Sequence, residues 1–142
     1  MRFLKHIIIS LIFTNCITNG SLENKDSFEL GTYNSEVKKL FYSEDYQMPI
    51  SLDLQYKITF DNNGTFIQYL TGNVWYGTTK TVENRIYNGT WEYTDNKLCL
   101  DYDNSGMLCN DIKEVNSNNF KLKIENQHLI GAGIDWMLFN KE

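Results

Sequence analysis

The sequence predicts an all-β domain, an antiparallel up-and-down β-barrel or a curled meander of about eight strands with a short N-terminal helix. Three observations predict this class. Apolar residues recur with a period of two from Leu52 onward, which is typical of strands with one buried face. Turn-forming Asp, Asn and Gly residues separate these runs at hairpin spacing, and little room is left for helix. A two-sheet sandwich is the alternative.

Residues 1–20 have the pattern of a secretory signal peptide. Arg2 and Lys5 precede the apolar run of residues 7–13, and the run is too short to span a bilayer. Small residues before position 21 favour cleavage after Gly20 and leave one β domain of residues 21–142. Alternatively, Cys16 is the lipidated first residue of a lipoprotein, and only then would the protein attach to a membrane. Either interpretation predicts a periplasmic or extracellular protein.

The expected elements follow in order. Residues 35–42 are expected to form the helix, with Ser35 as its N-cap and Val37, Leu40 and Phe41 on one face. The strand 52–60 and the strand 65–71 flank an Asp61–Gly64 hairpin turn. Turns are expected at residues 72–73 and 83–84. A third strand, residues 74–81, is expected between them, and a fourth, residues 85–93, after the second turn.

The next hairpin carries a cysteine pair. If Tyr102 faces Gly106 across the turn, Cys99 falls opposite Cys109, and opposed strand positions suit a disulfide. After it, Phe120, Leu122 and Ile124 are expected to point inward. The last strand is expected at residues 134–139, with Ile134, Trp136 and Leu138 on one face.

Charge argues against nucleic acid as a partner. The chain has 13 Lys and Arg against 18 Asp and Glu, a formal net charge of −5. Arg2 and Lys5 lie in the signal, which has no acidic residue, so residues 21–142 keep 11 basic residues and a net charge of −7. Phosphate backbones are repelled by such a surface.

Three segments resemble small bacterial lipocalin-like domains over residues 52–125. They are Phe60-Asp61-Asn62-Asn63-Gly64-Thr65-Phe66, Gly89-Thr90-Trp91-Glu92-Tyr93 and Lys97-Leu98-Cys99-Leu100. The resemblance implies a small exported β-barrel and supports the fold more than a task. A second similarity, to periplasmic lysozyme inhibitors, rests on Ser105-Gly106 in a tight loop. It implies an interaction loop formed by Asp103, Asn104, Ser105 and Gly106.

Large rings are the candidate ligand-binding residues. A pocket would be lined by Trp75, Trp91, Tyr87, Tyr93 and Trp136. The alternative is that the same rings plug the barrel, since small barrels fill their own interior. We expect Trp91 to be buried, with Tyr87 and Tyr93 on the same face of its strand.

Catalysis and metal binding are poorly supported. His128 is the one histidine beyond the signal and lies in a polar, turn-like stretch, so no catalytic triad and no zinc site is expected. Asp101, Asp103 and Asp111 cluster around the cysteine hairpin but lack the spacing of a calcium loop. We therefore expect no cofactor, no metal and no enzymatic activity.

Two functions remain open for a monomeric exported barrel. One is the binding of a small apolar ligand inside the barrel. The other is a protein-interaction module, such as a lysozyme-type inhibitor or an envelope-assembly lipoprotein, with an envelope protein as its partner. A dry apolar pocket favours the first function, whereas a filled barrel with an exposed, rigid 103–106 loop favours the second.

The predicted disulfide can be tested by intact mass. Cys99 and Cys109 are expected to take up alkylating reagent only after reduction, because an oxidising compartment joins an even cysteine pair in an exported domain. Two free thiols in protein recovered from that compartment would contradict the prediction.

Overall fold

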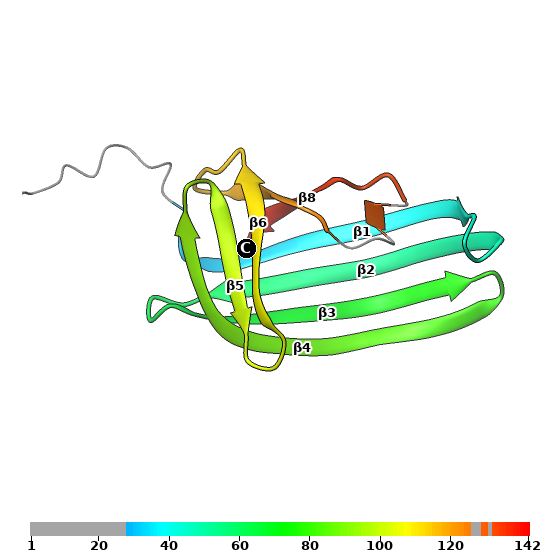
Figure 1. Ribbon diagram of the computed structural model, residues 1–142, viewed down its shortest axis with the longest axis horizontal. Helices are drawn as coiled ribbons and strands as arrows, with labels where there is room; N and C mark the ends of the chain where they lie inside the picture. The colour runs from blue at the N-terminus through cyan, green and yellow to red at the C-terminus, as the bar shows by residue number, and fades with distance from the viewer. Residues whose placement is uncertain (1–27, 126–128, 131) are drawn as a thin grey trace, which may run out of the picture.

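The computed structural model, which describes residues 28–125, 129–130 and 132–142, is a closed barrel of eight antiparallel strands (Figure 1). Each strand pairs with its neighbours in chain order, and the eighth returns to the first. The all-β up-and-down barrel predicted from the sequence is therefore confirmed. The strands are β1 (Gly31–Ser43), β2 (Met48–Phe60), β3 (Thr65–Tyr76), β4 (Thr79–Thr94), β5 (Lys97–Tyr102), β6 (Gly106–Lys113), β7 (Asn119–Lys123) and β8 (Trp136–Lys141).

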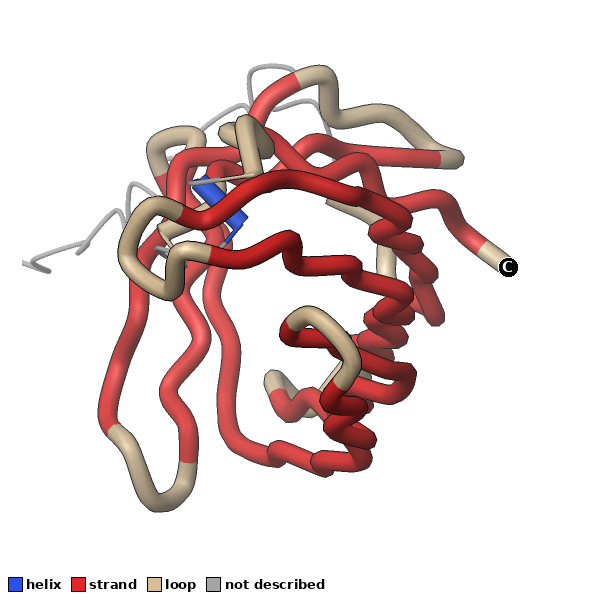
Figure 2. Tube along the Cα trace, turned by 90° about the vertical axis from the view of Figure 1, so that its right-hand side faces the viewer, coloured by secondary structure: helices blue, strands red, loops and turns tan. Residues whose placement is uncertain are grey.

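The strands differ greatly in length. Strands β1 to β4 have 12 to 16 residues and pair along almost their whole lengths. Strands β5 to β8 have only 5 to 8 residues. The long strands therefore form a curved sheet that the short strands close at one end, and the sheet extends beyond them at the other end (Figure 1). Viewed from that far end, the strands curl round into a barrel (Figure 2).

A short seam completes the barrel between β1 and β8. It consists of two residue pairs, Tyr33 with Lys141 and Asn34 with Asn140. The Glu142 amide extends it by donating to the Thr32 carbonyl oxygen at 2.9 Å. Strand β1 continues past this seam to Ser43, paired with β2.

Aromatic side chains fill the closed end of the barrel. We call this group the aromatic plug; it comprises Phe28, Tyr33, Phe60, Trp91, Phe120 and Phe139. The Phe60 ring centroid lies 5.2 Å from Trp91 and the Phe120 centroid 5.0 Å from Phe139. Tyr33, Phe60 and Phe120 are fully buried, whereas Trp91 is half-buried and donates its indole Nε1–H to the Asp61 carbonyl oxygen at 3.3 Å. Tyr87 and Tyr93 share the inner face of β4 with Trp91, as expected.

The helix predicted for residues 35–42 is wrong, because this segment is part of β1. Burial alternates along the strand, with Tyr33, Ser35 and Val37 turned inward, and Leu40 is exposed. Pairing with β2 along its whole length satisfies the backbone hydrogen bonds of β1. Tertiary pairing thus overrides the local helical pattern that Val37, Leu40 and Phe41 suggested.

Two predicted turns are also wrong. Residues 72–73 lie inside β3 and residues 83–84 inside β4, and the two strands are joined instead at residues 77–78. A Cβ atom on Gly72 would overlap the Asp53 carbonyl oxygen of β2, and Gly72 has a φ of +131°. The glycine therefore permits a close approach between two strands rather than a change of chain direction. The predicted Asp61–Gly64 turn is confirmed between β2 and β3.

The cysteine hairpin has the predicted register. Tyr102 pairs with Gly106 and Cys99 with Cys109, and the two cysteines form a disulfide. Strand β8, by contrast, presents the opposite face from the one expected. Met137 and Phe139 are buried, while Leu138 is exposed. The inward-facing positions of β8 are therefore shifted by one residue from the expected positions Ile134, Trp136 and Leu138.

A glycine in β4 allows this strand to pass from the long sheet to the short strands. Gly89 pairs with Phe66 of β3 and with Tyr102 of β5. A Cβ atom at Gly89 would overlap the carbonyl oxygen of Asp101 and lie 3.0 Å from the Phe66 ring. Figure 1 shows β4 curving upward where it leaves the long sheet.

Replacing Gly89 by alanine is expected to destabilise the protein by about 3 kcal/mol, the upper range for overpacking a well-packed interior. Urea unfolding of Gly89→Ala should show this loss. Thr90→Ala is the matched control, since Thr90 is exposed and its truncation should change stability by only about 0.5 kcal/mol. Equal stability of the two variants would contradict the packing argument.

Candidate functional site

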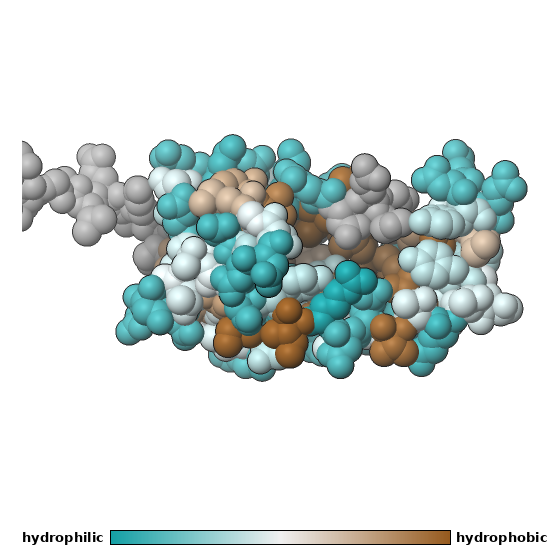
Figure 3. Space-filling model, turned by 60° about the horizontal axis from the view of Figure 1, so that its bottom comes forward, coloured by the Kyte–Doolittle hydropathy of each residue, from teal (hydrophilic) through white to brown (hydrophobic). Residues whose placement is uncertain are grey.

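A cavity of about 460 Å³ lies inside the barrel, which we call the barrel cavity. Side chains from six strands line it, because the inner faces of β2, β3, β5, β6, β7 and β8 all reach it. Figure 3 shows a hollow in the molecular surface with brown, hydrophobic atoms inside and a largely hydrophilic rim. The cavity begins where the aromatic plug ends, since Phe120 and Phe139 belong to both.

Half of the described residues that line the cavity are aliphatic. The strand period of two turns one residue in every two inward, and the sequence places branched or unbranched apolar residues at these positions. Five of them are Ile58, Leu98, Leu100, Leu122 and Met137, and Leu129, from the segment between β7 and β8, joins them in the wall. All six are buried in the structure. A wall of this kind binds apolar surface and excludes water.

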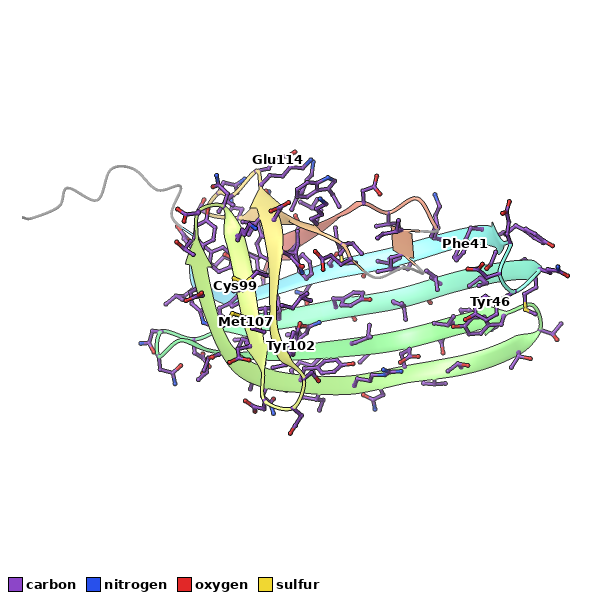
Figure 4. The ribbon with its side chains drawn as sticks, viewed as in Figure 1. Phe41, Tyr46, Cys99, Tyr102, Met107 and Glu114 are labelled. Carbon is purple, nitrogen blue, oxygen red and sulfur yellow. A yellow bond between two sulfur atoms is a disulfide. The ribbon has the colours of Figure 1, made fainter. Side chains whose placement is uncertain are left out.

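Tyr102 crosses one side of the cavity to reach β3. It pairs with Gly89 of β4 at the end of β5, where Figure 4 labels its side chain. The ring makes an edge contact with Phe66 at a centroid distance of 5.3 Å. Its hydroxyl group donates to Gln68 Oε1 at 3.0 Å. Strands β3 and β5 are thereby joined by a polar contact inside an otherwise apolar wall.

The phenols of the cavity are held in their neutral form. Burial raises the pKa of Tyr56 to about 12, and the nearby Tyr87 and Glu83 add to the shift. Burial likewise raises the pKa of Tyr102 to about 12, with smaller contributions from Tyr87 and Tyr56. Desolvation disfavours a phenolate in such a site. The hydroxyl groups are therefore uncharged hydrogen-bonding groups at physiological pH.

A second space of about 310 Å³, the outer chamber, continues along the long strands. Tyr56 and Leu129 line both spaces and so mark their boundary. The outer chamber carries an ion pair, in which Arg85 Nε lies 2.8 Å from Glu83 Oε2. A hydrogen bond to Tyr87 and the adjacent Glu83 carboxylate raise the pKa of Arg85. Formal charge is thus present in the outer chamber.

The five predicted pocket residues are divided between the interior and the surface. Tyr87 is next to the cavity, with its ring centroid 5.8 Å from that of Tyr102, while Trp91 belongs to the aromatic plug and Tyr93 packs beside it. Trp75 and Trp136 occupy outward positions of β3 and β8. Lys80 and Lys113 cover their rings at 5.5 Å and 3.8 Å.

Sequence reasoning missed several residues that line the cavity, among them Gln68, Leu108 and Asn110. The signal was present for the last two. The correct cysteine register places Cys99 and Cys109 on one face of the hairpin, and alternation then turns Leu108 and Asn110 to the other. Gln68 gave no such signal, because a polar residue in a strand is more often at the surface.

The other predicted site residues do not form a cluster. Asp103, Asn104, Ser105 and Gly106 are exposed at the β5–β6 turn. Among the residues that the structure describes, no three His, Cys, Asp or Glu side chains are placed to share a metal ion. That holds for Asp101, Asp103 and Asp111; Asp111 lies 3.7 Å from Lys123 Nζ. Cys16, His128 and the predicted signal peptide lie outside the described residues.

The fold and cavity define a small, disulfide-bonded, eight-stranded antiparallel barrel with a largely apolar interior. Comparison with known proteins found no family model and no curated protein that matches this sequence. Within the described residues, no helix has both the length and the apolar character needed to span a membrane.

Tyr56 and Tyr102 are expected to ionise late in an alkaline titration followed by tyrosinate absorbance. Their pKa values of about 12 lie above the ordinary value of 10.0. Because the folded state raises these pKa values, their stabilising contribution is complete below pH 10 and is lost as the pH rises through 12. The double variant Tyr56→Phe/Tyr102→Phe should lose the share of the late absorbance change that these two residues supply, while the buried Tyr33, whose pKa burial also raises, keeps its own share. The prediction fails if wild type and variant differ only near pH 10 while circular dichroism reports a folded protein.

Proposed function

We propose that the protein is a non-enzymatic exported binding protein that holds a small apolar ligand in the barrel cavity. The barrel cavity itself carries this proposal. Its volume of about 460 Å³ falls within the range of roughly 300–1,000 Å³ for small-molecule sites. A wall of buried aliphatic residues with a few polar groups is the composition such sites share.

The distribution of charge supports an uncharged ligand. The polar side chains within the cavity are phenols and amides: Tyr56, Gln68, Tyr102 and Asn110. Lys123, the last residue of β7, and Glu125, which follows the strand, are the charged residues of the described lining, and both are exposed. A charged ligand would lose its hydration at the apolar wall without a buried counter-charge to replace it.

The carboxylates around the cavity argue for binding rather than hydrolysis. Glycosidase chemistry needs two acidic groups facing each other across a cleft. Glu125 is the one carboxylate in the described lining of the barrel cavity. Glu83, in the outer chamber, is paired with Arg85. This arrangement supports the non-enzymatic part of the proposal.

Export is supported by the disulfide between Cys99 and Cys109, because such bonds persist in oxidising compartments. Attachment through a lipid at Cys16 stays a prediction. So does the protein-interaction alternative through Asp103–Gly106. The space beside that turn holds only about 70 Å³, and the larger barrel cavity favours the ligand-binding function.

A substitution at the cavity wall tests the proposal. Leu108 lines the cavity yet is 39% exposed, so a larger side chain there can fill the space without disrupting the buried core. Leu108→Trp is expected to weaken binding of the neutral fluorescent probe N-phenyl-1-naphthylamine at least about tenfold, because the indole occupies the apolar space the probe needs.

Met107→Trp is the matched control, because Met107 precedes Leu108 on β6, points away from the cavity and is 60% exposed. This variant should bind the probe as the wild type does. If Leu108→Trp and Met107→Trp bind the probe with the same affinity, the probe binds outside the barrel and the proposal is contradicted. Native mass spectrometry of protein from its own source would then identify a co-purified ligand by its mass.

A further inference from the structure

One buried atom in the cavity wall has an unmet hydrogen-bonding capacity. Asn110 lies on β6 opposite Leu98, lines the barrel cavity and is only 7% exposed. Its Oδ1 atom has no hydrogen-bond partner among the residues that the structure describes. Buried polar atoms are nearly always paired in folded proteins, so this one requires an explanation.

The residues around Asn110 on the cavity wall are apolar. Its neighbours on the inner face of β6 are Leu108 and Ile112, and its partner across the strand pair is Leu98. An apolar residue would fit this wall without loss, since an amide buried without a partner is unfavourable. Packing therefore does not account for asparagine here, whereas recognition of a bound group does.

Nearby donors are not aimed at this atom. The Tyr102 hydroxyl group, the donor on the same wall, is engaged with Gln68 Oε1 at 3.0 Å. The positively charged Lys123 belongs to the outer part of the lining and is exposed. None of the described residues donates to Asn110 Oδ1, so a group held in the cavity can supply the donor.

We propose that Asn110 determines ligand specificity by accepting a hydrogen bond, through Oδ1, from a hydroxyl or amide N–H group of a neutral, mostly apolar ligand. This inference rests on the proposed function of the barrel cavity. An ionised carboxylate would place acceptor against acceptor, and an ammonium ion would find only the exposed carboxylate of Glu125 among the described lining residues. Alcohols, phenols and secondary amides are the ligand classes that match both the amide and the aliphatic wall.

The test compares two ligands that differ in one donor. The O–H of 1-naphthol can donate to Asn110, whereas 1-methoxynaphthalene has the same ring system and no donor. By isothermal titration calorimetry, wild-type protein is expected to bind 1-naphthol about tenfold more tightly, the effect of one hydrogen bond to a buried acceptor. In Asn110→Leu the ratio should fall to about one, mainly through weaker binding of 1-naphthol.

Met107→Leu is the matched control, because Met107 is exposed on β6, does not line the cavity, and its replacement keeps the Asn110 amide. It should preserve the preference for 1-naphthol. An unchanged preference in Asn110→Leu would overturn the role of Asn110 while leaving the proposed function in place. If neither compound binds the wild type, and Leu108→Trp has no effect on the probe, the proposed function fails together with this inference.

Thermal unfolding of the ligand-free protein gives a second readout. If Asn110 Oδ1 is unpaired in the free protein, Asn110→Leu should raise the Tm by about 3 °C or more, because it removes a buried unsatisfied group. A lower Tm would mean that the amide is satisfied within the fold, and this outcome would overturn the proposal.

Discussion

The aromatic plug is the interaction on which the rest of the structure depends. Tyr33, Phe60 and Phe120 come from β1, β2 and β7, so their contacts join strands far apart in the sequence at one end of the barrel. The Tyr33 hydroxyl group donates to the Glu29 carbonyl oxygen at 2.7 Å, which keeps a buried polar atom satisfied. Because the large rings are concentrated here, the smaller aliphatic residues farther along the strands leave a cavity that they cannot fill.

The difference in length between the long and the short strands determines at which end the barrel is open. The long strands β1 to β4 continue past the end of β5 and β6 (Figure 1). The inner faces of β2, β3 and β4 there form the outer chamber without a facing wall from the short strands. Gly89 and Gly72 allow this sheet to curve, because each brings the backbones of paired strands closer than a side chain would permit. The disulfide holds β5 to β6, the hairpin that supplies Leu100, Leu108 and Asn110 to the cavity.

The sequence was sufficient to predict the barrel class, the Asp61–Gly64 turn and the register of Cys99 with Cys109, since these depend on local pairing rules. It was insufficient where a segment fits both the helical and the strand period, and where a glycine fits both a turn and a close contact between strands. Residues 35–42 have a helical pattern, and only their pairing with β2 makes them a strand. The sequence alone does not distinguish a glycine at a turn from one such as Gly72, which lies at a close contact between strands. The cavity was harder still, because whether a ring such as Trp136 faces inward depends on one residue of register in β8.

The seam between β1 and β8 has a consequence for how the barrel opens. Two residue pairs join β1 to β8 and two join β6 to β7, whereas β1 and β2 are paired along thirteen residues. Local opening costs least where the fewest backbone hydrogen bonds must break together. The amides of β8 and β7 should therefore exchange with solvent through partial openings that leave β1 to β4 intact. In backbone pairing, β7 and β8 are joined to β6 and β1 by fewer residues than the long strands are to one another, while Phe120 and Phe139 hold them through the aromatic plug. These two strands form one side of the cavity.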